Sequence, residues 1–291
     1  MFTTTLQTYF QSLQDFNQFD FLFTSLITII FLSLTMGFIS PFILYRKKAF
    51  MGSAISHSSL LGLAIAQVTL GLDQAINSFF LTLMITVFTT FFLAYSTYNQ
   101  QKLGVNKTDD SAIGIFYTSS MALGIIIHQL FSKTKNDLLS FLFGNVLFLS
   151  TFDLWLSAIL CIFVFLIFGI FFSKWIYLTI DEEDAALAGL NPKLFHYLFY
   201  LILTLVIVIS IKIAGTLLIE TMLLVPGFFA LNLKLDLKKT FYASIAFSLC
   251  SSLIGLTLAN AFNLPPGATL SITQVIILFL GFIGIKLFKY N

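Results

Sequence analysis

The sequence FMGSAISHSSLLGLAIA, residues 50–66, contains no Asp, Glu, Lys or Arg, and its only titratable side chain is His57. If this run is a membrane helix, Ser53 and His57 lie four residues apart on one face. A titratable, metal-ligating side chain at membrane depth indicates a functional site by default. The alternative is a histidine hydrogen-bonded to the backbone of a neighbouring helix. The small and hydroxyl residues around it are Gly52, Ser53, Ala54, Ser56, Ser58, Ser59 and Gly62.

The composition indicates a membrane protein. Of the 291 residues, 58% are hydrophobic and only 10% are charged, and the mean hydropathy is +0.97. Soluble domains are about 25% charged, so this composition excludes a soluble enzyme. The net charge of +2 is too small for a nucleic-acid-binding surface.

The apolar runs predict an all-α polytopic membrane protein with eight to nine transmembrane helices, because a bilayer core needs about 20 apolar residues per span. Lys212 separates two short runs, which form either two spans or one broken unit. Residues 1–20 are predicted to be an extracytoplasmic tail or interfacial helix, and residues 21–291 a transmembrane domain. The predicted spans are residues 21–45, 49–72, 75–97, 112–131, 151–178, 194–211, 213–232, 238–260 and 268–289.

The distribution of Lys and Arg predicts the orientation in the membrane. With the N-terminus outside, the outer loops hold only Lys133, Lys135 and Lys212, and the other twelve of the 15 cations lie inside. Because cytoplasmic loops are enriched in Lys and Arg, an odd number of spans then places the C-terminus inside.

Residues 181–190 are predicted to form a short cytoplasmic helix. Asp181 can cap its N-terminus, the next acidic residues suit a first helical turn, and Gly189 with Pro192 ends it. Its small-residue body would let another protein approach, and an ordinary solvated helix is the alternative. The chain has no nucleotide-binding motif, so any ATPase must be a separate subunit.

Glu220 is the other candidate inside the membrane. A carboxylate in the apolar run between Gly215 and Pro226 costs several kcal/mol unless it is hydrated or paired. His57 is one candidate partner. A protonated Glu220 hydrogen-bonded to backbone is the alternative.

Six segments of the chain are residues 51–62 (MGSAISHSSLLG), 109–124 (DDSAIGIFYTSSMALG), 143–154 (FGNVLFLSTFDL), 181–189 (DEEDAALAG), 212–230 (KIAGTLLIETMLLVPGFFA) and 264–267 (LPPG). Together these segments resemble the permease subunits of metal-ion ABC transporters, the zinc, manganese and iron uptake group. This resemblance implies a type II ABC importer-like permease fold in the plasma membrane of a bacterium. It also implies a dimer with an identical or related permease, a cytoplasmic ABC ATPase and an extracytoplasmic metal-binding protein.

The resemblance also implies roles for individual residues. The acidic segment would be the coupling helix that docks on the ATPase, through Asp181, Glu182, Glu183, Ala185 and Gly189. Family members usually carry an aspartate four residues before the pore histidine, and this chain has Ser53 there.

We therefore expect Glu220 to replace the lost carboxylate and to form a transient pore site with His57. A mixed nitrogen and oxygen pair suits Zn, Mn or Fe(II) without choosing among them. No permanently bound cofactor is expected. The alternatives are a proton-coupled carrier that uses His57 and Glu220 as a relay, and an ABC permease for a siderophore or a cobalamin-type substrate.

Overall fold

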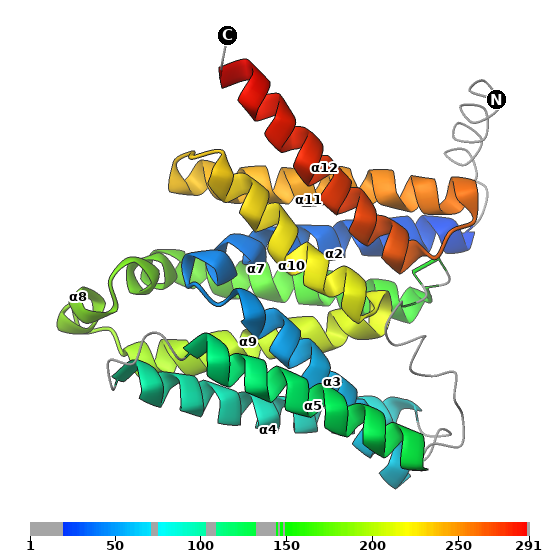
Figure 1. Cartoon of the computed structure of the whole chain (residues 1–291), viewed down its shortest axis with the longest axis horizontal. Coiled ribbons are helices and arrows are strands. Elements are labelled where there is room, and N and C mark those ends of the chain that lie inside the picture. Colours follow the sequence, from blue (N-terminus) through cyan, green and yellow to red (C-terminus); the bar gives the residue numbers. More distant parts are fainter. Residues whose placement is uncertain are drawn as a thin grey trace. The chain divides into compact units, whose positions relative to one another are not determined.

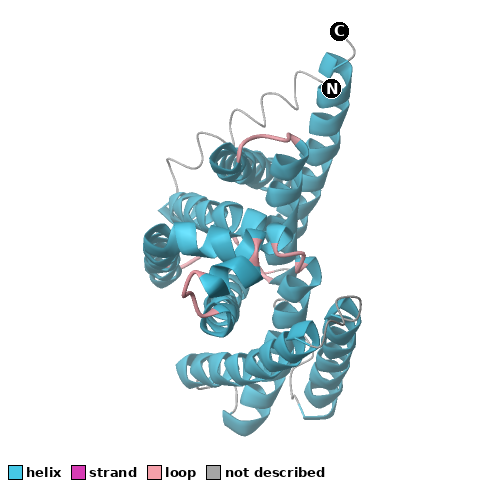
Figure 2. Ribbon diagram, turned by 90° about the vertical axis from the view of Figure 1, so that its left-hand side faces the viewer, coloured by secondary structure: helices cyan, strands magenta, loops and turns pink. Residues whose placement is uncertain are grey.

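The computed structural model is built from helices and connecting loops (Figures 1 and 2), and it describes residues 20–70, 75–102, 109–131, 144, 146–147 and 149–289. The predicted N-terminal tail, and most of the loop before residue 150, lie outside these residues. The chain divides into two compact units. The first comprises Met1–Lys47, Leu139–Phe165 and Ser210–Asn291, and the second comprises Lys48–Leu138 and Leu166–Ile209.

Eight of the described helices are long and apolar enough to cross a membrane, which confirms the predicted all-α architecture of eight to nine spans. The remaining apolar helix, α10, has 17 residues and is therefore about 25 Å long. The helices are α2 (Asp20–Tyr45), α3 (Ala49–Leu70), α4 (Ala75–Lys102), α5 (Asp109–Phe131), α7 (Thr151–Ile180), α8 (Glu182–Leu187), α9 (Pro192–Ala214), α10 (Thr216–Asn232), α11 (Leu237–Phe262) and α12 (Pro266–Lys289).

The break between α9 and α10 lies three residues beyond the predicted one. We expected Lys212 to separate the two runs, but α9 continues through it and ends at Ala214. The break is at Gly215, whose φ of 81° is in the left-handed region that only glycine adopts readily. A charged side chain can extend towards the membrane surface without interrupting a helix, whereas a change in the sign of φ interrupts it.

In the first unit, α2 packs against α10 and α11, and α12 packs against the same two helices. Two glycines allow close crossings. A Cβ at Gly37 of α2 would lie 2.8 Å from the Cβ of Ser248 in α11, and the neighbouring Ser244 Oγ donates to the Gly37 carbonyl at 2.7 Å. At the other crossing, the Gly227 amide of α10 donates to Ser40 Oγ of α2 at 2.8 Å. At both crossings, glycine lets the two backbones come close and a serine hydroxyl forms a hydrogen bond between the helices, as is usual in membrane proteins.

In the second unit, α3 packs against α4 and α5, with Gly62 against the backbone of Thr82. The C-terminal half of α7 packs against α9 through aromatic rings. Trp175 is fully buried, and its ring centroid lies 5.3 Å from those of Phe168 and Phe195. This unit holds His57, and the first unit holds Glu220.

Candidate functional site

His57 lies in the first half of α3, and only 7% of its surface is exposed. Ser56, Ser58 and Ser59 are buried around it, and each hydroxyl donates to a carbonyl of its own helix at 2.7–2.9 Å. These bonds pair the three serine hydroxyls within α3 itself. The small serine side chains therefore let other helices pack closely against α3, and their hydroxyls are not left unpaired among apolar residues. Ser53, one turn earlier, is half-buried.

Tyr117 of α5 lies against His57. The two ring centroids are 4.6 Å apart, and the ring planes meet at 77° in an edge-to-face arrangement. Tyr117 is half-buried, more exposed than the histidine that it contacts. Sequence reasoning missed this contact because Tyr117 stands in an apolar run with no sign of its partner.

Glu220 lies in the second turn of α10 and is half-buried. The hydroxyl oxygen of its neighbour Thr221 lies 2.9 Å from the Leu218 carbonyl oxygen and 3.2 Å from Ser271 Oγ of α12. Because Glu220 and His57 belong to different units, the expectation that they form one site stays a prediction. Among the described residues, no three His, Cys, Asp or Glu side chains are grouped as a metal centre.

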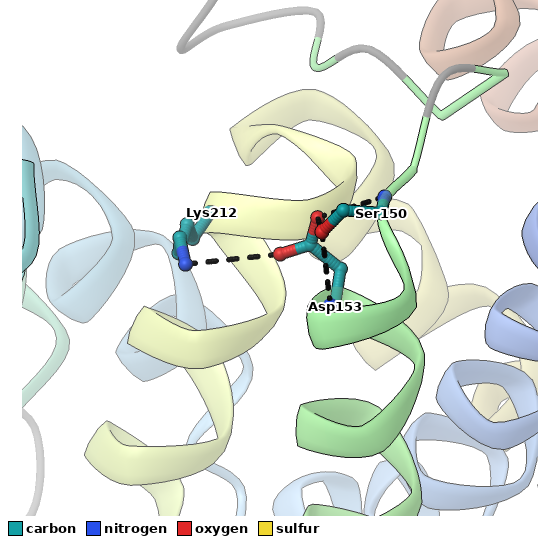
Figure 3. Close-up of polar contacts among 3 residues, drawn as sticks. All are labelled: Ser150, Asp153 and Lys212. Atoms are coloured by element: carbon teal, nitrogen blue, oxygen red, sulfur yellow. Dashed lines mark hydrogen bonds and ion pairs between the residues drawn. The ribbon is translucent and has the colours of Figure 1, made fainter.

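A polar cluster joins α7 to α9 in the first unit (Figure 3). Ser150 Oγ donates to Asp153 Oδ2 at 2.6 Å, and the Asp153 amide donates back to Ser150 Oγ at 3.3 Å. Lys212 Nζ lies 3.7 Å from Asp153 Oδ1. The same Nζ lies 4.7 Å from the ring centroid of Phe152. The Ser-x-x-Asp spacing at the start of α7 is a signal that could have identified this reciprocal cap. The partnership with Lys212 has no such signal, because it joins distant parts of the chain.

The short helix α8 begins with a side-chain cap. Asp181 Oδ1 accepts hydrogen bonds from the amides of Glu183 and Asp184, both at 3.0 Å. The helix ends before Gly189, whose φ is 86°. Of its residues, Ala185 is buried, Glu182 is half-buried, and Leu187 is 87% exposed. Such a short helix with an acidic first turn and one exposed leucine can present a compact surface to a partner, and this role stays a prediction.

His196 has a structural position. Its Nε2 lies 3.2 Å from the Ala94 carbonyl of α4 and 3.5 Å from Thr97 Oγ1. Thr97 Oγ1 is in turn 2.9 Å from the hydroxyl of Tyr200. These contacts join α9 to α4 within the second unit.

The sequence of the chain matches known families and individual proteins over most of its length. The profile of the ABC 3 transport family matches residues 18–285. The chain is 34% identical over 274 residues to the manganese transport system membrane protein MntC of Listeria monocytogenes, and the alignment covers 93% of each chain. It is 31% identical over 259 residues to the "Probable iron transport system membrane protein" of Haemophilus influenzae, covering 88% of this chain and 91% of the other.

A solved structure has the same fold. The structure matches a chain of PsaBC from Streptococcus pneumoniae, which was solved in complex with a Fab, at a TM-score of 0.78 and 30% sequence identity. The match covers 94% of each chain. The match therefore extends over almost the whole length of both proteins.

Proposed function

The chain belongs to the ABC 3 transport family, and from this premise we propose that it forms the membrane path of an ATP-driven importer for a divalent metal ion. Its similarity to a manganese transport protein supports manganese as the substrate, and its similarity to a protein named for iron makes iron the second candidate. The observation that carries the proposal is His57, an imidazole buried in an apolar helix. Neutral imidazole suits Fe(II), and Mn(II) favours carboxylate oxygen, which Glu220 would add to the site.

His57 would be the nitrogen ligand on this path. Ser53 stands one turn before it and, as a neutral hydroxyl, is a poor ligand for a divalent cation. Glu220 would supply the missing carboxylate from α10. One or two protein ligands suit a transport path, because a site that binds too tightly would retain the ion.

The helix α8 would transmit the conformational change. ATP binding in a separate cytoplasmic ATPase would press on residues 181–190, where the Asp181 cap stabilises the start of the short helix. The exposed Leu187 would add an apolar contact to the acidic surface. An extracytoplasmic metal-binding protein would deliver the ion, and an identical or related permease would form the other half of the path.

Uptake of radiolabelled manganese tests the proposal. The host is a bacterial strain without its own manganese importers that expresses the chain with its cognate ATPase and binding protein. We expect His57→Ala to reduce uptake to the level of cells without the permease, and Glu220→Gln to reduce it strongly. His196→Gln is the matched control, because it alters a buried histidine with a structural position and should retain uptake per folded permease.

Two outcomes would contradict parts of this proposal. Normal uptake by His57→Ala would exclude His57 as a ligand, and normal uptake by Glu220→Gln would exclude the compensating carboxylate. Uptake that persists with a catalytically inactive ATPase would instead support the proton-coupled carrier. Competition by a metal chelate, and not by the free ion, would support the siderophore-type permease.

A further inference from the structure

We propose that Tyr117 is a positioning residue for metal transport, whose ring sets the orientation in which His57 meets the ion. The inference rests on the proposed function, because it takes His57 as a ligand. Its own basis is the edge-to-face contact between the two rings, at a centroid distance of 4.6 Å and an angle of 77°.

The packing of α3 against α5 holds this contact in place. Gly124 lies seven residues after Tyr117, two turns along the same side of α5. A Cβ at Gly124 would lie 3.1 Å from the Leu61 amide nitrogen and 3.2 Å from its Cα. The backbones of α3 and α5 are therefore close together at Leu61, one turn after His57. This close approach keeps the Tyr117 ring against the imidazole.

The orientation of an imidazole decides whether it can bind a metal. In neutral imidazole the unprotonated ring nitrogen offers its lone pair in the plane of the ring, so rotation about the Cβ–Cγ bond turns that lone pair away from an ion. That torsion has broad, roughly two-fold preferences, and the backbone alone does not fix it. Metal-binding histidines are usually oriented by a second group, and loss of that group weakens metal binding.

The ring contact has a suitable strength for this task. An aromatic pair in edge-to-face geometry changes an equilibrium by about two- to twelvefold beyond the effect of buried area. That range is large enough to favour one imidazole orientation, yet small enough that the site still releases the ion. Tyr117 is half-buried and His57 is 7% exposed, so the ring contact lies at a partly accessible place on α5.

The test measures binding of Mn²⁺ alone to the purified permease–ATPase complex without its binding protein. Electron paramagnetic resonance of free Mn²⁺ gives the Kd, and nitrogen hyperfine coupling on the bound ion reports the imidazole. We expect Tyr117→Leu to raise the Kd about two- to twelvefold and to weaken the nitrogen coupling. Tyr117→Phe keeps the ring and should restore both.

Phe116→Leu is the matched control, because it removes a neighbouring ring of the same helix. Phe116 lines a groove of about 300 Å³ between α4 and α5 together with Phe92. We expect this variant to leave the Kd unchanged. If Tyr117→Leu cannot be purified, Tyr117→Met fills the space with a flexible chain and should raise the Kd in the same way.

The outcomes separate this inference from the proposed function. If His57→Ala abolishes the nitrogen coupling while Tyr117→Leu or Tyr117→Met binds like the wild type, the positioning role is wrong and the ligand assignment stands. A Tyr117→Phe variant as weak as Tyr117→Leu would also overturn it, because the hydroxyl and not the ring would then matter. If His57→Ala binds Mn²⁺ with unchanged coupling, the proposed ligand itself is wrong.

Discussion

Replacing Gly227 with alanine should destabilise the first unit. A Cβ at this position would lie 2.5 Å from Ser40 Oγ, 2.8 Å from the Ser40 carbonyl carbon and 2.9 Å from the Pro41 nitrogen. Two of these atoms are backbone, so α2 and α10 must separate. Overpacking of this kind costs about 1–3 kcal/mol, and loss of the hydrogen bond from the Gly227 amide to Ser40 Oγ adds about 1 kcal/mol. The higher helix propensity of alanine returns about 1 kcal/mol, which leaves a net loss of about 1–3 kcal/mol.

Thermal unfolding of the purified permease in detergent measures this effect. At about 2–4 °C per kcal/mol, the scaling for chains of 150–250 residues, the loss should lower the Tm by about 2–12 °C. Gly169→Ala in α7 is the matched control, because no heavy atom lies within 4 Å of the added Cβ. That variant should be stabilised by about 0.5–1 kcal/mol. If both variants melt at or above the wild-type temperature, the crossing of α2 and α10 is not as close as the structure indicates.

The remaining predictions concern the polar cluster, the short helix and the structural histidine. Lys212→Ala should cost about 0.5–1.5 kcal/mol through the lost ion pair and ring contact, and a double-mutant cycle with Asp153→Asn, read by Tm, should show coupling between the two. Asp181→Ala should weaken the cap of α8 by about 1 kcal/mol and lower metal-stimulated ATP hydrolysis, whereas Asp181→Asn should retain both. Leu187→Glu should reduce co-purification of the ATPase without changing the Tm of the permease, because that side chain is exposed. Tyr200→Phe should cost about 1 kcal/mol through the lost contact with Thr97, and manganese uptake per folded permease should not change.

Local features of the fold could be predicted from residues close in sequence. The runs of apolar residues defined the long helices, because a membrane span depends on length and polarity alone. The start and end of α8 followed from Asp181 and Gly189, whose effects act within one turn. The place of His57 in an apolar helix followed in the same way.

The position of the break in the α9–α10 region shows where such reasoning is insufficient. Lys212 is the more conspicuous residue in the sequence, but the helix runs through it to Ala214. The backbone turns at Gly215. At this break, a Cβ at Gly144 would clash with the backbone of Ala214, so Gly144 packs directly against the end of α9. This contact joins residues that are far apart in the chain.

By itself, the sequence determined that this protein is a bundle of membrane helices, that one of these helices carries a histidine among serines, and that a capped acidic helix follows α7. Only the tertiary structure decided that the ring of Tyr117 contacts His57 and that Lys212 pairs with Asp153. The physical reason is that polarity and caps act within a helix, whereas the rotation of one helix against another depends on where glycines allow close approach. Gly124 and Gly227 mark such places, and their effect is visible only once the helices are packed.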